Sequence, residues 1–265
     1  MTGPETLRAL TYNVRYDTEE DGEHAWANRR ERVARTIRFH SPDLVALQEP
    51  LTHQFEYLRG RLPEFAWIGR GRLSSGEGEH CPIGVRRSRF SVEGTGTIWL
   101  SESGETGSVG WDAKLPRILT WVHVRDRKSD EPLALCNVHL DHEGERARRE
   151  SARLIAERLP EIASGRPAIL VGDLNCTERD EPYAILTDPE GPVDLFDAQY
   201  ASEAGHHGPT TTVTTFEERV PGRKIDHVFA SGGLPVVQHG VCSDRYDGGY
   251  PSDHLPVLAE LSVEE

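Results

Sequence analysis

Apolar residues are grouped along the chain in short runs that polar loops separate. Runs rich in apolar and β-branched side chains predict buried strands, and apolar residues spaced three and four apart predict helices. Strands are predicted over residues 7–14, 44–47, 65–69, 83–85, 90–92, 97–100, 118–124, 133–140, 168–171, 224–229, 236–241 and 255–261. Helices are predicted over residues 26–40, 54–62, 145–159 and 182–187.

The order of these elements narrows the fold class. Several successive strands are joined without a helix between them, and residues 118–124 and 133–140 are spaced as a hairpin. This order disfavours a doubly wound parallel sheet, in which helices alternate with strands. It favours an α+β domain in which two packed sheets are covered by helices on the outside.

Composition and charge limit the partners that the protein can bind. Asp and Glu outnumber Lys and Arg by 44 to 30, which gives a net charge of −14. The resulting field does not favour a long nucleic-acid backbone, so an anionic substrate needs a local positive site from Arg or a metal ion. The acidic composition also suits a cytoplasm of high ionic strength.

No segment predicts export or membrane insertion. The chain has no apolar run of about 18 residues, and residues 1–8 lack the basic start and apolar block of a signal peptide. We therefore expect a cytoplasmic protein with no membrane partner. The four cysteines form no Cys-x-x-Cys pair, which indicates free thiols rather than a zinc knuckle or redox motif; they are Cys81, Cys136, Cys176 and Cys242.

The stretch from Val171 to Asn175 combines a buried strand with polar chemistry. The apolar run 168–171 ends at Gly172, and Asp173 and Asn175 follow it two residues apart. Residues two apart on a strand project from the same face, so both side chains are expected to point to one site. A carboxylate beside an amide suits a pair that binds a metal or activates water. A simple turn after the strand is the alternative reading.

Other predicted strands also end in polar side chains that could share this site. Asn13, Glu49 and His139 each lie at the end of an apolar run, Asp253 and His254 precede the last strand, and Asp226 lies within another. One polar strand end is commonplace, but a dispersed set of acids, amides and histidines is not.

These residues lie in segments that resemble the endonuclease/exonuclease/phosphatase superfamily, the family of DNase I-like nucleases and inositol-polyphosphate phosphatases. The matching segments follow the family's order from residue 11 to residue 254: Thr11-Tyr12-Asn13-Val14, Leu47-Gln48-Glu49, Asn137-Val138-His139-Leu140, Gly172-Asp173-Leu174-Asn175, Lys224-Ile225-Asp226-His227 and Ser252-Asp253-His254. The resemblance implies one domain over residues 1–265. Its fold would be a four-layer α/β sandwich, and its activity that of a divalent-metal phosphoesterase.

The resemblance also implies a metal site. Glu49 is a hard oxygen ligand suited to Mg²⁺ or Mn²⁺, Asn13 helps to hold the ion or its water, and Asp253 could reach it. Arg15 occupies a position, two residues after Asn13, at which some nucleases of the family carry an acid. The metal geometry near Asn13 is therefore open.

The resemblance assigns the catalytic steps to five side chains. Asp173 is the general base for the attacking water, and Asn175 donates to a phosphoryl oxygen. His139 and His254 donate to the charge that develops in the transition state, while Asp226 orients His254 and favours its charged form.

Substrate contacts are expected from two further side chains, Arg117 and His80. An Arg suits bidentate contact with phosphate. Arg146 and Arg149 are read as a solvated helix face. Loops 70–80, 101–114 and 201–215 are expected to form the pocket walls, and loops carry specificity. The sequence therefore leaves the substrate and the oligomeric state open.

The preferred hypothesis is hydrolysis of a phosphodiester, such as a short or single-stranded nucleic acid or a small molecule. A phosphomonoesterase acting on a sugar or inositol phosphate is the first alternative, and a non-catalytic binding module of the same fold is another. A third is a zinc hydrolase, because Asn137-x-His139-x-Asp141-His142 approaches the His-x-His-x-Asp-His pattern of metallo-β-lactamase folds. Asn137 in place of the first His weakens that reading.

Overall fold

The computed structural model describes residues 5–263, so part of the segment 1–8 that we read as lacking a signal peptide lies outside the described residues. The helices are η1 (Glu19–His24), α1 (Trp26–His40), α2 (Thr52–Arg61), α3 (Glu145–Ala163), α4 (Glu181–Leu186) and α5 (Ala198–Ala201). The strands are β1 (Thr6–Asn13), β2 (Leu44–Gln48), β3 (Phe65–Ile68), β4 (Ile83–Arg86), β5 (Phe90–Trp99), β6 (Ile118–Asp126), β7 (Pro132–His139), β8 (Ala168–Asp173), β9 (Leu195–Asp197), β10 (His206–His207), β11 (Asp226–Ser231), β12 (Val236–Val241) and β13 (Val257–Ser262).

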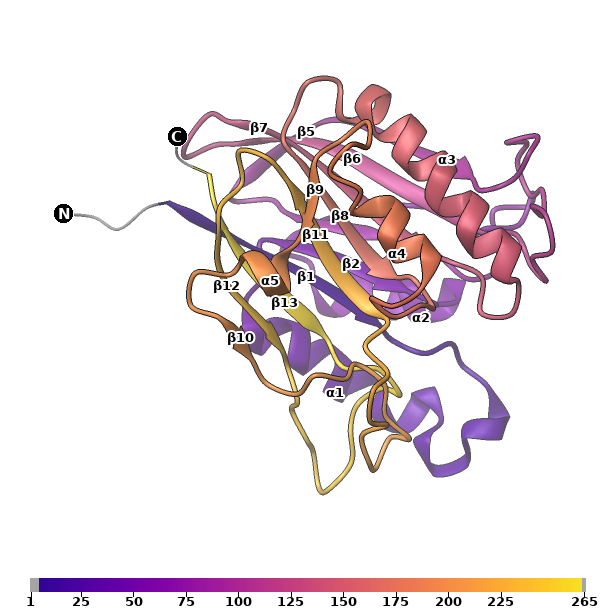
Figure 1. Cartoon of the computed structure of the whole chain (residues 1–265). Helices are drawn as coiled ribbons and strands as arrows, with labels where there is room; N and C mark the ends of the chain where they lie inside the picture. The colour runs from indigo at the N-terminus through magenta and orange to yellow at the C-terminus, as the bar shows by residue number, and fades with distance from the viewer. Residues whose placement is uncertain (1–4, 264–265) are drawn as a thin grey trace.

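The strands form two mixed sheets. One has seven strands in the order β10-β12-β13-β1-β2-β4-β3, and the other has six in the order β5-β6-β7-β8-β11-β9. Figure 1 shows α3 and α4 together on one outer side of the molecule. Three apolar clusters fill the spaces between four layers: one under α1 and α2, one between the sheets, and one under α3 and α4. The predicted α+β fold of two packed sheets with outer helices is therefore confirmed.

Alternation along the central strands decides which side chains enter the space between the sheets. In β8, Ile169 and Val171 belong to the cluster between the sheets, whereas Ala168 and Leu170 pack under α3. The residue two beyond Val171 on the same face is Asp173. The same face is thus apolar along most of the strand and polar at its end.

Two predictions of element bounds differ most from the structure. The pieces 90–92 and 97–100 are parts of one strand, β5, whose pairing with β6 shifts between Val92 and Gly94, as a bulge requires. The helix predicted to end at residue 159 continues through Pro160 to Ala163, because Ile162 and Ala163 pack in the same apolar cluster as the rest of its buried face.

A buried ion pair ties the two sheets together. Arg89 donates to Asp126 of β6 at 2.7 Å and to Asp43, which precedes β2, at 2.9 Å. Among the helices within residues 5–263, none is long and apolar enough to cross a membrane.

Candidate active site

Three neighbouring strands place His139, Asp173 and Asp226 side by side. In the parallel pair β7–β8, His139 is opposite Asp173, and in the antiparallel pair β8–β11, Asp226 is opposite Asp173. Paired residues on adjacent strands project from the same face. The register of the three strands therefore places one imidazole and two carboxylates at one end of the space between the sheets.

Asp173 is fixed by two hydrogen bonds. Asn13 Nδ2, from the opposite sheet, donates to its Oδ2 at 3.0 Å, and the backbone N–H of Asn175 donates to its Oδ1 at 2.8 Å. The side chain is 1% exposed. Burial, together with the negative charge of Asp226, raises the pKa of Asp173 to about 7. Such a carboxyl is poised to exchange a proton near neutral pH.

Glu49 lies on the other side of Asn13. Asn13 Nδ2 donates to Glu49 Oε1 at 2.8 Å, and the backbone N–H of Tyr16 donates to Oε2 at 3.0 Å. Glu49 has a positive φ of 72°, just after β2 ends, which is uncommon for a residue with a side chain. Uncommon backbone of this kind clusters at functional sites.

His254 and Asp226 form a buried ion pair. The two groups are 2.8 Å apart at His254 Nδ1 and Asp226 Oδ2, and His254 Nε2 lies 3.8 Å from Asp173 Oδ2. Burial opposes charging of the imidazole, but Asp226 and Asp173 outweigh it and raise the pKa of His254 well above its ordinary value. The ring is therefore an imidazolium at neutral pH.

His139, unlike His254, is neutral at neutral pH. Burial lowers its pKa well below the ordinary value, and the positive charge of Arg117 acts in the same direction. Its Nε2 lies 3.0 Å from Asn175 Nδ2 and 3.5 Å from Asp173 Oδ2. Asn175 Nδ2 also donates to Leu140 O at 3.1 Å, so this amide holds the histidine in place.

Glu79 is a site residue that we did not predict. Its Oε2 lies 3.9 Å from His139 Nδ1, and Arg72 donates to both of its oxygens, at 2.9 and 2.7 Å. Burial and the nearby charge of Glu49 raise the pKa of Glu79 to about 7. Loop 70–80 carries no periodicity that marks a buried acid, although an Arg seven residues before a Glu is consistent with an ion pair across the loop.

The two residues predicted to contact substrate have different surroundings. Arg117 is buried beside the site and donates to Asp141 Oδ2 at 3.1 Å, with His142 Nδ1 2.8 Å from its other end. His80 is also buried, but its ring packs on Phe55 and its Nδ1 lies 2.9 Å from Gly78 O. The structure thus brings Arg117 close to His139 and gives His80 packing and backbone contacts.

Of the residues predicted to hold the metal, Glu49 belongs to a set of possible ligand atoms and Asp253 does not. Two sets of donor atoms lie close enough to share an ion: Glu49 with His139 and Asp173, and Asp173 with Asp226 and His254. Asp253 belongs to neither set, and its Oδ2 lies 3.7 Å from Arg15 Nη1. The arginine that replaces an acid after Asn13 therefore faces this carboxylate.

The donor set fits a hard divalent cation. Glu49 and Asp173 offer oxygen atoms, the ligand type that Mg²⁺ and Mn²⁺ prefer. Asp226 Oδ1 is buried without a hydrogen-bond partner within the described structure. Burial and a neighbouring carboxylate raise the pKa of both Asp173 and Glu79, and a bound cation would offset this effect.

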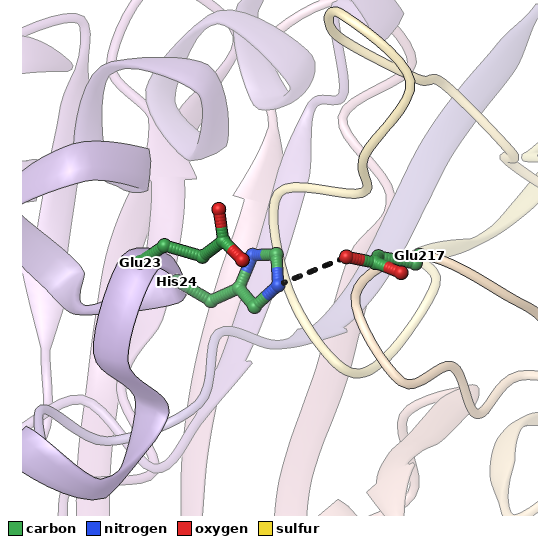
Figure 2. Close-up of side chains that lie close together, drawn as sticks. All are labelled: Glu23, His24 and Glu217. Atoms are coloured by element: carbon green, nitrogen blue, oxygen red, sulfur yellow. Dashed lines mark ion pairs between the residues drawn. The ribbon is translucent and has the colours of Figure 1, made fainter.

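Figure 2 shows a third group of possible ligands, Glu23, His24 and Glu217, outside this site. The His24 ring stacks on Phe216, and its Nε2 lies 3.9 Å from Glu217 Oε1, whose side chain is 65% exposed. These exposed carboxylates lack the burial and the fixed hydrogen bonds of the site around Asp173.

The zinc-hydrolase alternative is wrong. Asn137 is fully buried between the sheets, where its Nδ2 donates to Leu47 O and Pro82 O. Asp141 is paired with Arg117 rather than turned toward His139. Asn137 and Asp141 therefore do not converge with His139 on a zinc site.

The two packed sheets, with a cluster of buried acids and histidines at one end of the space between them, define a two-sheet α/β sandwich. The sequence matches the Endonuclease/Exonuclease/phosphatase family over residues 10–254, and the chain belongs to that family. Members of the family hydrolyse phosphoester bonds. The predicted family is thus confirmed.

Three relatives illustrate the likeness. A family protein from Bacteroides thetaiotaomicron has a TM-score of 0.92 and 31% identity, with 99% of both chains covered. A mannosyl-6-phosphatase from the same species has a TM-score of 0.90 and 32% identity, covering 96% of this chain and 99% of that one. Carbon catabolite repressor protein 4 homolog 6 from Arabidopsis thaliana is 21% identical over 178 residues, which are 62% of this chain but only 23% of that protein.

Proposed function

We propose that this protein hydrolyses a phosphoester by attack of a water molecule that Asp173 activates, with Mg²⁺ or Mn²⁺ as cofactor. One observation carries the proposal: the Asp173 carboxylate lies between two imidazoles, 3.5 Å from His139 Nε2 and 3.8 Å from His254 Nε2. A base flanked by groups that can stabilise a developing oxyanion is the arrangement that phosphoryl transfer to water needs.

Each side chain has a role that follows from its charge state. Asp173 accepts a proton from the attacking water. The imidazolium of His254, kept charged by Asp226, donates to a phosphoryl oxygen as negative charge develops there. Asn175 and neutral His139 hold each other in position beside the same carboxylate.

The metal is assigned to Glu49, with Asn13 positioning the carboxylate and Asp173 or His139 within reach. A bound divalent cation supplies Lewis acidity and neutralises charge on the leaving oxygen. That Asp253 reaches the ion stays a prediction.

For the substrate we favour a phosphomonoester of a small polar molecule, such as a sugar phosphate, over the phosphodiester expected from the sequence. The solved mannosyl-6-phosphatase matches almost the full length of the chain at 32% identity. The net charge of −14 also disfavours a long nucleic acid. We assign contact with a substrate oxygen to Arg117, whose positive charge acts on His139.

The test compares para-nitrophenyl phosphate, bis(para-nitrophenyl) phosphate and a hexose phosphate, each with Mg²⁺, Mn²⁺ or EDTA. We expect metal-dependent turnover with preference for the monoesters, and a loss of about 10²–10⁴-fold in Asp173→Asn. Asp247→Asn, at an exposed carboxylate, is the matched control. Faster hydrolysis of the diester would instead support the substrate class predicted from the sequence. Turnover by Asp173→Asn at the wild-type rate would show that Asp173 is not the base.

A further inference from the structure

A second constellation of reactive groups lies in a groove whose lining includes none of the proposed catalytic residues. The groove has a volume of about 460 Å³ and lies between the end of α1, the end of β12 and the segment that follows it. Its reactive lining residues are His40, Cys242 and Asp244, joined there by His207, His239 and Leu258.

His40 links a thiol to a carboxylate through its two ring nitrogens. Nδ1 lies 3.7 Å from Cys242 Sγ, and Nε2 lies 2.6 Å from Asp244 Oδ2. The backbone N–H of Cys242 donates to Pro256 O at 2.8 Å, which fixes the main chain at this residue. A thiol, an imidazole and a carboxylate in this order form an activated nucleophile and its orienting partners.

Charged surroundings keep His40 protonated. The hydrogen bond that His40 donates to Asp244, with a contribution from Cys242, raises the pKa of His40 to about 10. His40 is also the last residue of α1, where the partial negative charge of the helix end favours a cation. The other titratable side chains that line the groove are His207 and His239, and burial lowers the pKa of His239 to about 3, so that ring is neutral.

Access distinguishes Cys242 from the other cysteines. Cys81, Cys136 and Cys176 are buried, with exposed fractions of 5%, 0% and 4%, and burial raises the pKa of each to about 12. Cys242 is only partly buried. It alone among the four combines access with a cationic neighbour, the microenvironment of a reactive cysteine.

We propose that Cys242 is a reactive thiol that exchanges with a low-molecular-weight disulfide bound in this groove. The Cys242 thiolate attacks one sulfur of the disulfide, a new S–S bond forms, and the original S–S bond breaks. The departing thiolate takes a proton from the His40 imidazolium and leaves as a thiol. Cys242 ends as a mixed disulfide with one half of the small molecule, the other half leaves as a thiol, and no other oxidant is needed.

The pH dependence of alkylation tests the thiolate. The full-length reduced protein is treated with iodoacetamide between pH 6 and 8, and adducts are mapped by mass spectrometry. An ordinary thiol would lose about tenfold in rate per pH unit below its pKa of about 8.5. We expect a single rapid adduct at Cys242 whose rate falls less steeply with pH than that of an ordinary thiol.

Variants test whether the reactivity of Cys242 depends on His40 and Asp244 or only on the exposure of the thiol. His40→Gln should restore the steep pH dependence of an ordinary thiol, and Asp244→Asn should do so in part. His53→Gln, at an exposed histidine that also has an Asp partner, is the matched control and should behave as wild type. If His40→Gln fails to fold, Asp244→Asn and the wild-type profile still decide the matter.

Exchange itself is tested with oxidised glutathione. We expect one glutathionyl adduct per chain, at Cys242, reversed by a thiol reductant and absent in Cys242→Ser. The proposal is overturned if the adduct maps to another cysteine, if no mixed disulfide forms, or if wild type and His40→Gln share the profile of an ordinary thiol.

Discussion

At the residue scale, Asp173 owes its properties to neighbours that are distant in the sequence. The sequence predicts that Asp173 lies at a strand end beside Asn175, because alternation along β8 is readable from residues 168–171. It does not reveal that Asn13 donates to its carboxylate or that Asp226 lies opposite it. Asp226 lies 53 residues after Asp173, and Asn13 lies 160 residues before it. Their contacts with Asp173 therefore depend on how the strands that carry them are placed in the fold.

Glu79 shows the limit of sequence reasoning most clearly. It lies in a loop rich in Gly and Ser, where no period of two or 3.6 separates buried from exposed positions. Only the folded loop shows that Arg72 holds it beside His139. His80, its neighbour, was predicted for substrate contact, but its ring packs on Phe55.

Gly172 is the residue on which the position of Asp173 most directly depends. Its φ is +147°, and a Cβ at this position would overlap the carbonyl oxygen of Val138 in the paired strand β7. Gly172→Ala should therefore cost about 1–3 kcal/mol or more in the free energy of unfolding and should reduce turnover by moving Asp173.

The measurement for Gly172→Ala is a urea denaturation curve together with the steady-state rate. Gly60→Ala is the control, since a Cβ there meets nothing within 4 Å and the residue lies in α2. That substitution should raise stability by about 0.5–1 kcal/mol. If the two variants had the same stability and the same rate, Gly172 would not be needed for the close approach of β7 and β8.

At the element scale, the buried strands and long helices were predictable because their apolar periods are strong. Helix α1 was predicted at its observed bounds, and the hairpin β6–β7 was predicted from two apolar runs. The short elements β9, α5 and β10 were not, because elements of four or fewer residues carry little periodic signal. Their conformation is set by the sheet edges that they join.

A buried polar network joins β9 to β11. Lys224 Nζ donates to Asp197 Oδ2 at 2.8 Å, and His227 Nδ1 lies 3.5 Å from the same oxygen. Burial alone would raise the pKa of Asp197, but His227 and Lys224 hold it well below its ordinary value. Because the folded pKa lies below the unfolded one, the stabilisation is complete above the unfolded value of about 3.9 and is lost as the pH falls through the folded one.

Asp197→Asn should accordingly destabilise the protein by about 3–5 kcal/mol at pH 7, because it leaves Lys224 buried without its counter-charge. The difference from wild type should narrow as the pH falls below about 4. Urea midpoints of both proteins at several pH values measure this. A difference that stays constant down to pH 2 would show that the charge of Asp197 does not stabilise the fold.

At the scale of the whole molecule, charge is the dominant feature. A net charge of −14 on 265 residues produces self-repulsion in the folded state. Salt screens it, since the Debye length falls from about 10 Å at 0.1 M to about 3 Å at 1 M. The melting temperature should therefore rise between 0.1 and 1 M KCl. A melting temperature that is unchanged or lower at 1 M would exclude adaptation to a high-salt cytoplasm.

The layered architecture also bears on domain organisation. One apolar cluster between the sheets includes residues from Leu7 to Val263. The family match over residues 10–254 spans both sheets. We propose that residues 1–265 fold as one domain, as expected from the sequence. The order of the motifs made the family predictable, whereas we expect the substrate to depend on loops 70–80, 101–114 and 201–215, which no motif describes.

The central claim is that the site around Glu49 and Asp173 is a metal-dependent phosphoesterase centre. Its most direct test is the rate of phosphomonoester hydrolysis as a function of Mn²⁺ concentration in wild type, Glu49→Gln and the double variant Glu23→Gln/Glu217→Gln. The account predicts that Glu49→Gln raises the Mn²⁺ concentration needed for half-maximal rate by at least about tenfold, and that the double variant matches wild type. The account would be contradicted if Glu49→Gln kept the wild-type dependence while the double variant lost it.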